Sequence, residues 1–92
     1  MERITEAQLQ SGVDRLNRST NSPLTAWSTT DKGYQANIGN YHLDFAYSYV
    51  SLARMMNHGG GIERILPGGT KRELYEQLHA FLRGIASTKE GA

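Results

Sequence analysis

The sequence predicts a small α+β domain, and three observations lead to that fold class. Two segments begin with helix-capping patterns and continue with apolar residues at helical spacing. Two short segments of strand composition flank a turn, which is typical of a β-hairpin. The longest apolar stretch lies between these units. The predicted order is therefore helix, β-hairpin, central buried helix, short helical turn and C-terminal helix, within one domain that spans residues 1–92.

The first helix is expected to begin at Thr5, which can cap it, because Gln8 occupies the capping-box position three residues later. Its apolar residues share one face: Leu9, Val13 and Leu16. A polar connection follows, and Pro23 disfavours helical geometry at the residue before it. The helix should therefore end near Asn17.

Residues 24–29 and 34–39 are the predicted strands of the hairpin. With a three-residue loop that ends in Gly33, the side chain of Tyr34 shares a face with Ala26. With a four-residue loop, it shares a face with Trp27 instead. The sequence leaves both registers open. Because an isolated hairpin is marginal in water, one of its faces must pack on the helices.

Residues 41–56 are expected to form the central helix, with Asn40 as its cap. Two apolar rows run along this segment: Leu43, Ala46, Tyr47 and Val50 in one, and Phe45, Tyr49, Leu52 and Met56 in the other. A helix that is apolar on two sides is buried between partners. The glycines at 59–61 are then its stop and a hinge.

The segment from Ile62 to Leu66 is predicted to be a short helical turn, which Pro67 ends. Thr70 and Glu73 form a second capping box, the strongest local signal in the chain. The helix that follows has its apolar residues on one face: Leu74, Leu78, Phe81, Leu82 and Ile85. Residues 86–92 are expected to fray.

Composition bears on the partners that the protein can have. Ten basic and nine acidic residues give a formal charge of +1, which provides no electrostatic case for a nucleic-acid or membrane partner. The absence of cysteine fits a reducing compartment. No segment has the pattern of a signal peptide or a membrane span. We therefore expect a cytoplasmic protein.

No residue pattern predicts catalysis or a metal site. The string from His58 to Gly61 matches the oxyanion-hole sequence of some esterases, but the nucleophile motif that such enzymes need is absent. Glu76 and His79 supply only half of a di-iron motif. We expect no enzyme, no metal and no cofactor.

Aromatic residues supply the best candidate for a binding surface. Tyrosines at 41, 47 and 49 turn around a helix, so they cannot all face one core. Tyrosine, tryptophan, methionine and arginine are the residue types enriched at protein interfaces. The candidate partner-binding residues are Trp27, Tyr41, His42, Tyr47, Tyr49, Arg54 and His58. The alternative is a core edge whose hydroxyl groups reach water.

Two other kinds of binding stay open. Anions or nucleic acid would use the basic residues Arg64, Lys71, Arg72 and Arg83, and this hypothesis requires that they share one exposed face. A small ligand would use the glycines at 59–61 and 68–69, next to an aromatic wall.

Several segments carry a likeness to known proteins: Val-Asp-Arg-Leu-Asn, Ser-Pro-Leu-Thr, Ala-Asn-Ile-Gly-Asn-Tyr-His-Leu-Asp-Phe-Ala-Tyr, Asn-His-Gly-Gly-Gly, Thr-Lys-Arg-Glu-Leu-Tyr-Glu and Ala-Phe-Leu-Arg-Gly-Ile. They span nearly the whole chain and resemble a group of small proteins encoded by tailed bacteriophages and prophages. That group has no assigned activity. The resemblance therefore implies a context, a phage accessory protein in the bacterial cytoplasm, and no catalytic residues.

The leading hypothesis is a non-enzymatic accessory protein that binds a host or phage protein and modulates a host enzyme or defence system. A DNA- or RNA-binding transcriptional regulator is the first alternative, and a small-ligand-binding sponge is the second. Self-association stays open.

Overall fold

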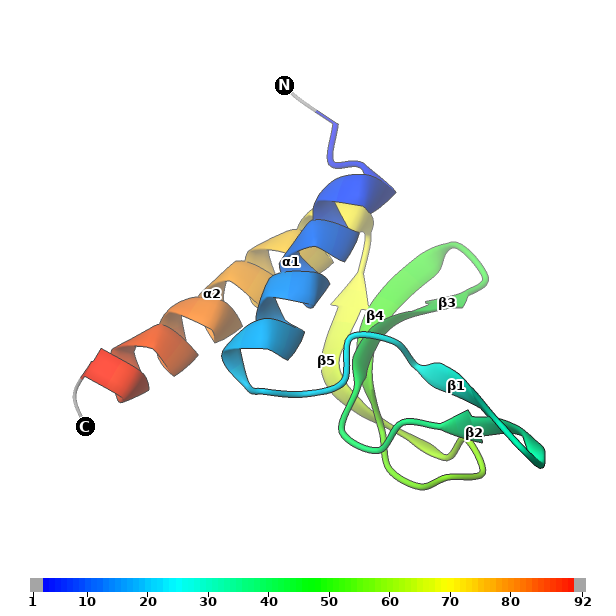
Figure 1. Ribbon diagram of the computed structural model, residues 1–92. Coiled ribbons are helices and arrows are strands. Elements are labelled where there is room, and N and C mark those ends of the chain that lie inside the picture. The colour runs from blue at the N-terminus through cyan, green and yellow to red at the C-terminus, as the bar shows by residue number, and fades with distance from the viewer. Residues whose placement is uncertain (1–2, 91–92) are drawn as a thin grey trace.

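Two helices pack on one face of a three-stranded antiparallel sheet, and a separate two-stranded hairpin lies beside one end of that sheet (Figure 1). The computed structural model describes the backbone of residues 3–90 and the side chains of residues 3–88. The elements are α1 (Glu6–Ser19), β1 (Trp27–Thr30), β2 (Gly33–Ala36), β3 (Tyr41–Ala46), β4 (Tyr49–Met55), β5 (Ile62–Gly69) and α2 (Lys71–Glu90). The predicted α+β class is confirmed.

Both predicted capping boxes are present. The Thr5 amide donates to Gln8 Oε1 at 2.8 Å, and the Gln8 amide donates to Thr5 Oγ1 at 3.2 Å. At the start of α2, the Thr70 amide donates to Glu73 Oε1 at 3.0 Å, and the Glu73 amide donates to Thr70 Oγ1 at 3.1 Å. Of the segment expected to fray, residues 86–90 belong to α2, and residues 91–92 lie outside the described part of the chain.

The predicted central helix is a β-hairpin. Residues 41–46 and 49–55 form β3 and β4, which pair from Tyr41 opposite Arg54 to Ala46 opposite Tyr49. Leu43 and Leu52 lie opposite each other and face the helices, while Asp44 and Ser51 share the other face. The segment is rich in aromatic residues, which favour strands. Apolar residues alternate with polar residues along β3 and again along β4. Read as one segment, the two alternations happen to give the spacing of a helix face.

The predicted helical turn at 62–66 is also wrong, because these residues belong to β5. The sheet order is β3-β4-β5, so β5 is an outer strand. Pro67 is compatible with this position, since an outer strand does not need every amide for pairing. The glycines at 59–61 therefore lie in the loop between β4 and β5 and do not end a helix.

The core lies between the helices and the sheet. Its largest fully buried apolar side chains are Leu9, Val13, Leu16, Leu52, Leu74 and Leu78. The apolar faces predicted for the two helices are thus the faces that become buried.

On each outer strand, a side chain from a helix forms hydrogen bonds with the backbone amide and carbonyl of one residue. The Asn17 side chain, 0% exposed, accepts from the Tyr41 amide at 2.8 Å and donates to the Tyr41 carbonyl at 3.0 Å. Gln77 accepts from the Gly68 amide at 2.8 Å and donates to the Gly68 carbonyl at 3.2 Å. Each side-chain amide satisfies one backbone donor and one backbone acceptor, as a neighbouring strand would.

The β1–β2 hairpin packs on the loop between β4 and β5. Trp27 lies opposite Ala36, and Thr29 lies opposite Tyr34. The loop has two residues, fewer than either predicted length. Trp27 shares a face with Tyr34, as predicted for the four-residue loop. The Ala36 amide donates to the His58 carbonyl at 3.1 Å. A Cβ atom at Gly60 would lie only 2.8 Å from Trp27 Cη2, so the indole ring requires glycine there.

Candidate functional site

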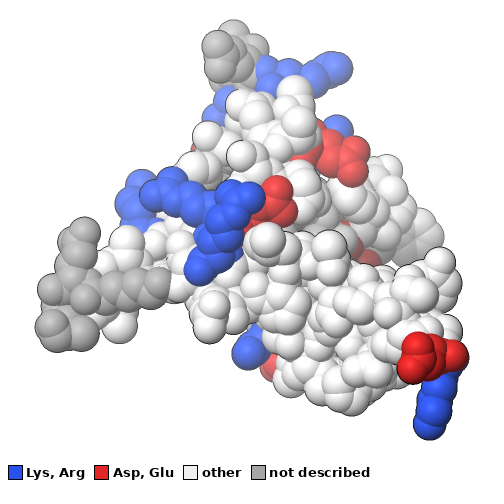
Figure 2. Space-filling view, viewed as in Figure 1, with Lys and Arg blue, Asp and Glu red and all other residues white. Residues whose placement is uncertain are grey.

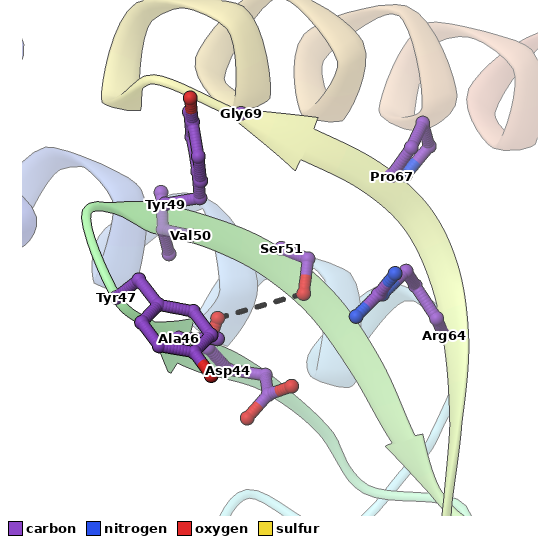
Figure 3. Close-up of a pocket in the computed structure, with 9 residues that line it drawn as sticks. All are labelled: Asp44, Ala46, Tyr47, Tyr49, Val50, Ser51, Arg64, Pro67 and Gly69. Atoms are coloured by element: carbon purple, nitrogen blue, oxygen red, sulfur yellow. Dashed lines mark hydrogen bonds between the residues drawn. The ribbon is translucent and has the colours of Figure 1, made fainter.

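The face of the sheet that points away from the helices carries a pocket of about 370 Å³ (Figure 3). All three strands contribute to it. Its lining residues are Asp44, Ala46, Tyr47, Tyr49, Val50, Ser51, Arg64, Pro67 and Gly69. This volume is within the range of small-ligand and side-chain pockets in proteins.

Tyr47 stands at the rim of this pocket, at the tip of the β3–β4 hairpin. Its side chain is fully exposed. Tyr47 and Ser48 form a two-residue turn, and Tyr47 has a φ of 58°, in the left-handed region. The first position of such a turn is normally glycine, because a side chain there costs about 1–2 kcal/mol. Tyr47 is therefore both exposed and strained.

Opposite charges line the same pocket. Figure 3 shows Asp44 next to the Tyr47 ring and the Arg64 side chain extending from β5 toward the strand of Ser51. Both charged residues belong to the described part of the chain, and no ion pair joins them. Ser51 donates to the Asp44 carbonyl at 3.5 Å, a long contact. A ligand thus finds a carboxylate, a guanidinium group and a tyrosine ring within one concavity.

The predicted partner-binding residues fall into three places. Tyr47 and Tyr49 line the pocket. Trp27 and His58 lie where the β1–β2 hairpin meets the loop between β4 and β5. His58 Nδ1 lies 2.8 Å from Gln35 Nε2. The remaining three residues are in or near the core.

Tyr41 is one of the candidate partner-binding residues, but it is buried, with 9% of its surface exposed. Its ring packs edge-on against Phe81, and the Arg54 guanidinium lies 5.4 Å from the ring centroid. His42 is half-buried and contacts Asn40 at 3.2 Å. Arg54, another partner-binding candidate, thus makes a cation–π contact inside the protein.

Asp44, Ser51 and Pro67 are site residues that the sequence analysis missed. In strands, residues 42, 44 and 46 share one face of the sheet with residues 49, 51 and 53. This pattern would have placed Asp44 next to Ser51, but only after the two segments were recognised as strands. Arg64 was identified, yet it was assigned to a different kind of site.

The four basic residues do not share one face. Arg64 lines the pocket on the side of the sheet away from the helices, whereas Lys71, Arg72 and Arg83 belong to α2. Arg72 also forms an ion pair with Glu76 at 3.8 Å. Figure 2 shows that Lys and Arg side chains gather over the two helices, while the surface over the sheet is mostly uncharged in this view. The arrangement required for a single nucleic-acid surface through these four residues is absent.

The glycine segments offer few free amides. Asn57 Oδ1 accepts from the amides of Gly59 and Gly61 at 3.0 and 2.9 Å, and the Gly68 amide is bound by Gln77. A phosphate-binding loop needs such amides to be unoccupied. Among the residues that the structure describes, no three His, Asp or Glu side chains come together as metal ligands.

Within residues 3–90, neither helix is long and apolar enough to cross a lipid bilayer. Comparisons of the chain with models of protein families, with curated proteins and with solved structures found no match.

Proposed function

We propose that the protein is a non-catalytic binding module, and that the pocket on the open sheet face recognises a segment of a partner protein. The observation that carries this proposal is Tyr47, a fully exposed aromatic residue in a strained backbone conformation. Strain of this kind is retained where the residue has a role other than stability. An exposed tyrosine provides a large contact area with a single hydroxyl group, which is the chemistry of protein interfaces.

The charges of the pocket favour a polypeptide ligand. Asp44 and Tyr47 suit a cationic side chain, through a carboxylate contact and a cation–π contact. Arg64 suits a carboxylate on the same ligand. A segment of protein that carries both signs of charge meets these requirements, whereas the phosphate backbone of a nucleic acid would be repelled by Asp44.

The biological setting follows from the resemblance to small phage and prophage proteins. In this proposal the protein acts in the bacterial cytoplasm as a phage accessory protein. Its partner is a host or phage protein, and binding modulates a host enzyme or defence system.

The test is affinity capture from bacterial lysate with the tagged wild-type protein and two matched variants, Tyr47→Ser and Tyr34→Ser. Tyr34 is 80% exposed but lies outside the pocket, so it controls for the loss of an exposed tyrosine. We expect a protein that is captured in the presence of nuclease by wild type and Tyr34→Ser, and lost with Tyr47→Ser. Capture that is unchanged by Tyr47→Ser, or that disappears with nuclease, would contradict the proposal.

A further inference from the structure

A second concave surface lies between the two helices and has a different chemistry. It has a volume of about 240 Å³ and is lined by Gln8, Ser11, Gly12, Arg15, Tyr75, His79 and Leu82. Gly12 brings the helices close together, because a Cβ atom at that position would lie 2.7 Å from Leu78 Cδ2. The groove is therefore built by helix packing and does not depend on loops.

The polar groups of this groove can each donate a hydrogen bond. Gln8 Oε1 is occupied by the Thr5 amide, so the Gln8 side chain has its NH₂ group left to donate. Arg15 and Ser11 contribute a guanidinium group and a hydroxyl group from the same helix face. The His79 ring packs against Tyr75, with 4.2 Å between the ring centroids and an angle of 52° between the ring planes.

No carboxylate lines the groove. The nearest acids in sequence are engaged elsewhere: Asp14 accepts from Gln10 at 3.0 Å, and Glu76 pairs with Arg72. The groove is thus lined by groups from two helices that can donate hydrogen bonds, and no acidic side chain is part of its lining. Figure 2 shows several basic side chains over these two helices, with acidic side chains beside them.

We infer that the groove between α1 and α2 binds a phosphoryl group, either as free phosphate or as a phosphate monoester. Arginine binds tetrahedral oxyanions through paired N–H groups, and the amide, hydroxyl and imidazole groups complete the set of donors. The volume accommodates the oxyanion and part of an attached group, which Tyr75 can contact. This site is independent of the pocket on the open sheet face.

The experiment is a titration of the ¹⁵N-labelled protein followed by ¹H–¹⁵N NMR, with inorganic phosphate, with adenosine monophosphate and with chloride at matched ionic strength. Saturable shifts of residues in the groove are expected with one or both phosphate compounds and not with chloride. Equal affinity for both compounds indicates a site for the ion alone, and tighter binding of the monophosphate indicates a phosphate ester as the ligand; both support the inference.

Two matched variants test the assignment to this groove. Arg15→Gln should weaken binding about tenfold or more, because a charge-assisted hydrogen bond is lost. Arg18→Gln removes an exposed arginine of the same helix that does not line the groove, and it should leave binding unchanged. Non-saturable shifts, shifts that chloride reproduces, or equal weakening by both variants would overturn the inference. Thermal unfolding with and without phosphate provides a second readout for each variant.

Discussion

At the scale of single residues, Tyr47 has a backbone conformation that glycine would adopt without strain and a ring that buries no surface in the protein. Neither property stabilises the folded state. Most proteins retain such residues where function requires them, at a cost in stability. Stability and binding should therefore respond to substitution of Tyr47 in opposite directions.

We predict that Tyr47→Gly raises the free energy of unfolding by about 0.5–1 kcal/mol, because relief of left-handed strain exceeds the added entropy of glycine in the unfolded chain. The same variant should lose the captured partner. Tyr47→Ala removes the ring but keeps the strain, so it should give no gain in stability. Urea unfolding of the three proteins provides the measurement, and Tyr47→Gly being less stable than Tyr47→Ala would refute the strain argument.

Asn17 makes the opposite contribution, since it is a polar residue that the core requires. Asn17→Ala should lower the free energy of unfolding by about 2–3 kcal/mol, because the Tyr41 amide and carbonyl are left buried without partners. The corresponding variant of half-buried Gln77, Gln77→Ala, should cost only about 1 kcal/mol, since water can reach Gly68. Equal losses for the two variants, measured by denaturant unfolding, would show that burial does not control the cost.

At the scale of elements, the helices could be predicted because their signals are local. Each capping box lies within four residues, and each apolar stripe lies within one helix. The strands β3 and β4 could not be predicted for two reasons. Their turn, Tyr47-Ser48, lacks the glycine or asparagine that marks most two-residue turns. In addition, Leu43 and Val50 satisfy a helical spacing as well as the strand alternation.

The candidate site was missed as a consequence of those two elements. Asp44, Ser51 and Arg64 come from three strands, and their proximity depends on the pairing of β3 with β4 and of β4 with β5. A helix over 41–56 would separate Asp44 from Ser51 by almost two turns. The exposure of Tyr47 and Tyr49 was one of two open interpretations, and it was argued from a helix that the structure replaces by two strands.

The cap of α2 gives a prediction of pH dependence. Hydrogen bonds from the backbone and then the side chain of Thr70 lower the pKa of Glu73 from its ordinary value of 4.5. Because the folded-state pKa is lowered, the stabilising contribution is complete above the unfolded pKa and is lost as the pH falls through the folded pKa. Glu73→Gln keeps a capping residue without a charge.

Thermal unfolding of wild type and Glu73→Gln between pH 3 and 7 tests this prediction. The difference between the two proteins should be largest above about pH 5 and should shrink toward pH 3. A difference that stays constant over this range would mean that the ionisation of Glu73 is not coupled to folding.

At the scale of the whole molecule, the chain consists of the helix-covered sheet and the β1–β2 hairpin docked beside it (Figure 1). We call the place where this hairpin meets the loop between β4 and β5 the joint, and Trp27 lies against Gly60 there. Because Trp27 is the only tryptophan of the sequence, its fluorescence reports on this joint alone.

Gly60→Ala should loosen the joint, since the added Cβ meets the indole ring and the φ of 98° disfavours alanine. We expect a red shift of tryptophan emission and a loss of about 1–3 kcal/mol in stability, with the circular dichroism of the helices unchanged. Gly59→Ala is the matched control, because its Cβ would meet only Asn57, at 3.4 Å. Identical spectra for the two variants would exclude the contact as the cause.

The side-chain amides of Asn17 and Gln77 occupy backbone groups on the outer edges of β3 and β5. An outer strand with unpaired backbone groups is a template for further strands, and this is a common origin of aggregation. Many proteins protect such strands with lysine, proline or a bulge. Here part of the protection comes from the helix layer, which places one side-chain amide on β3 and one on β5. A lone Asn or Gln within the apolar face of a helix can therefore indicate a protected sheet edge.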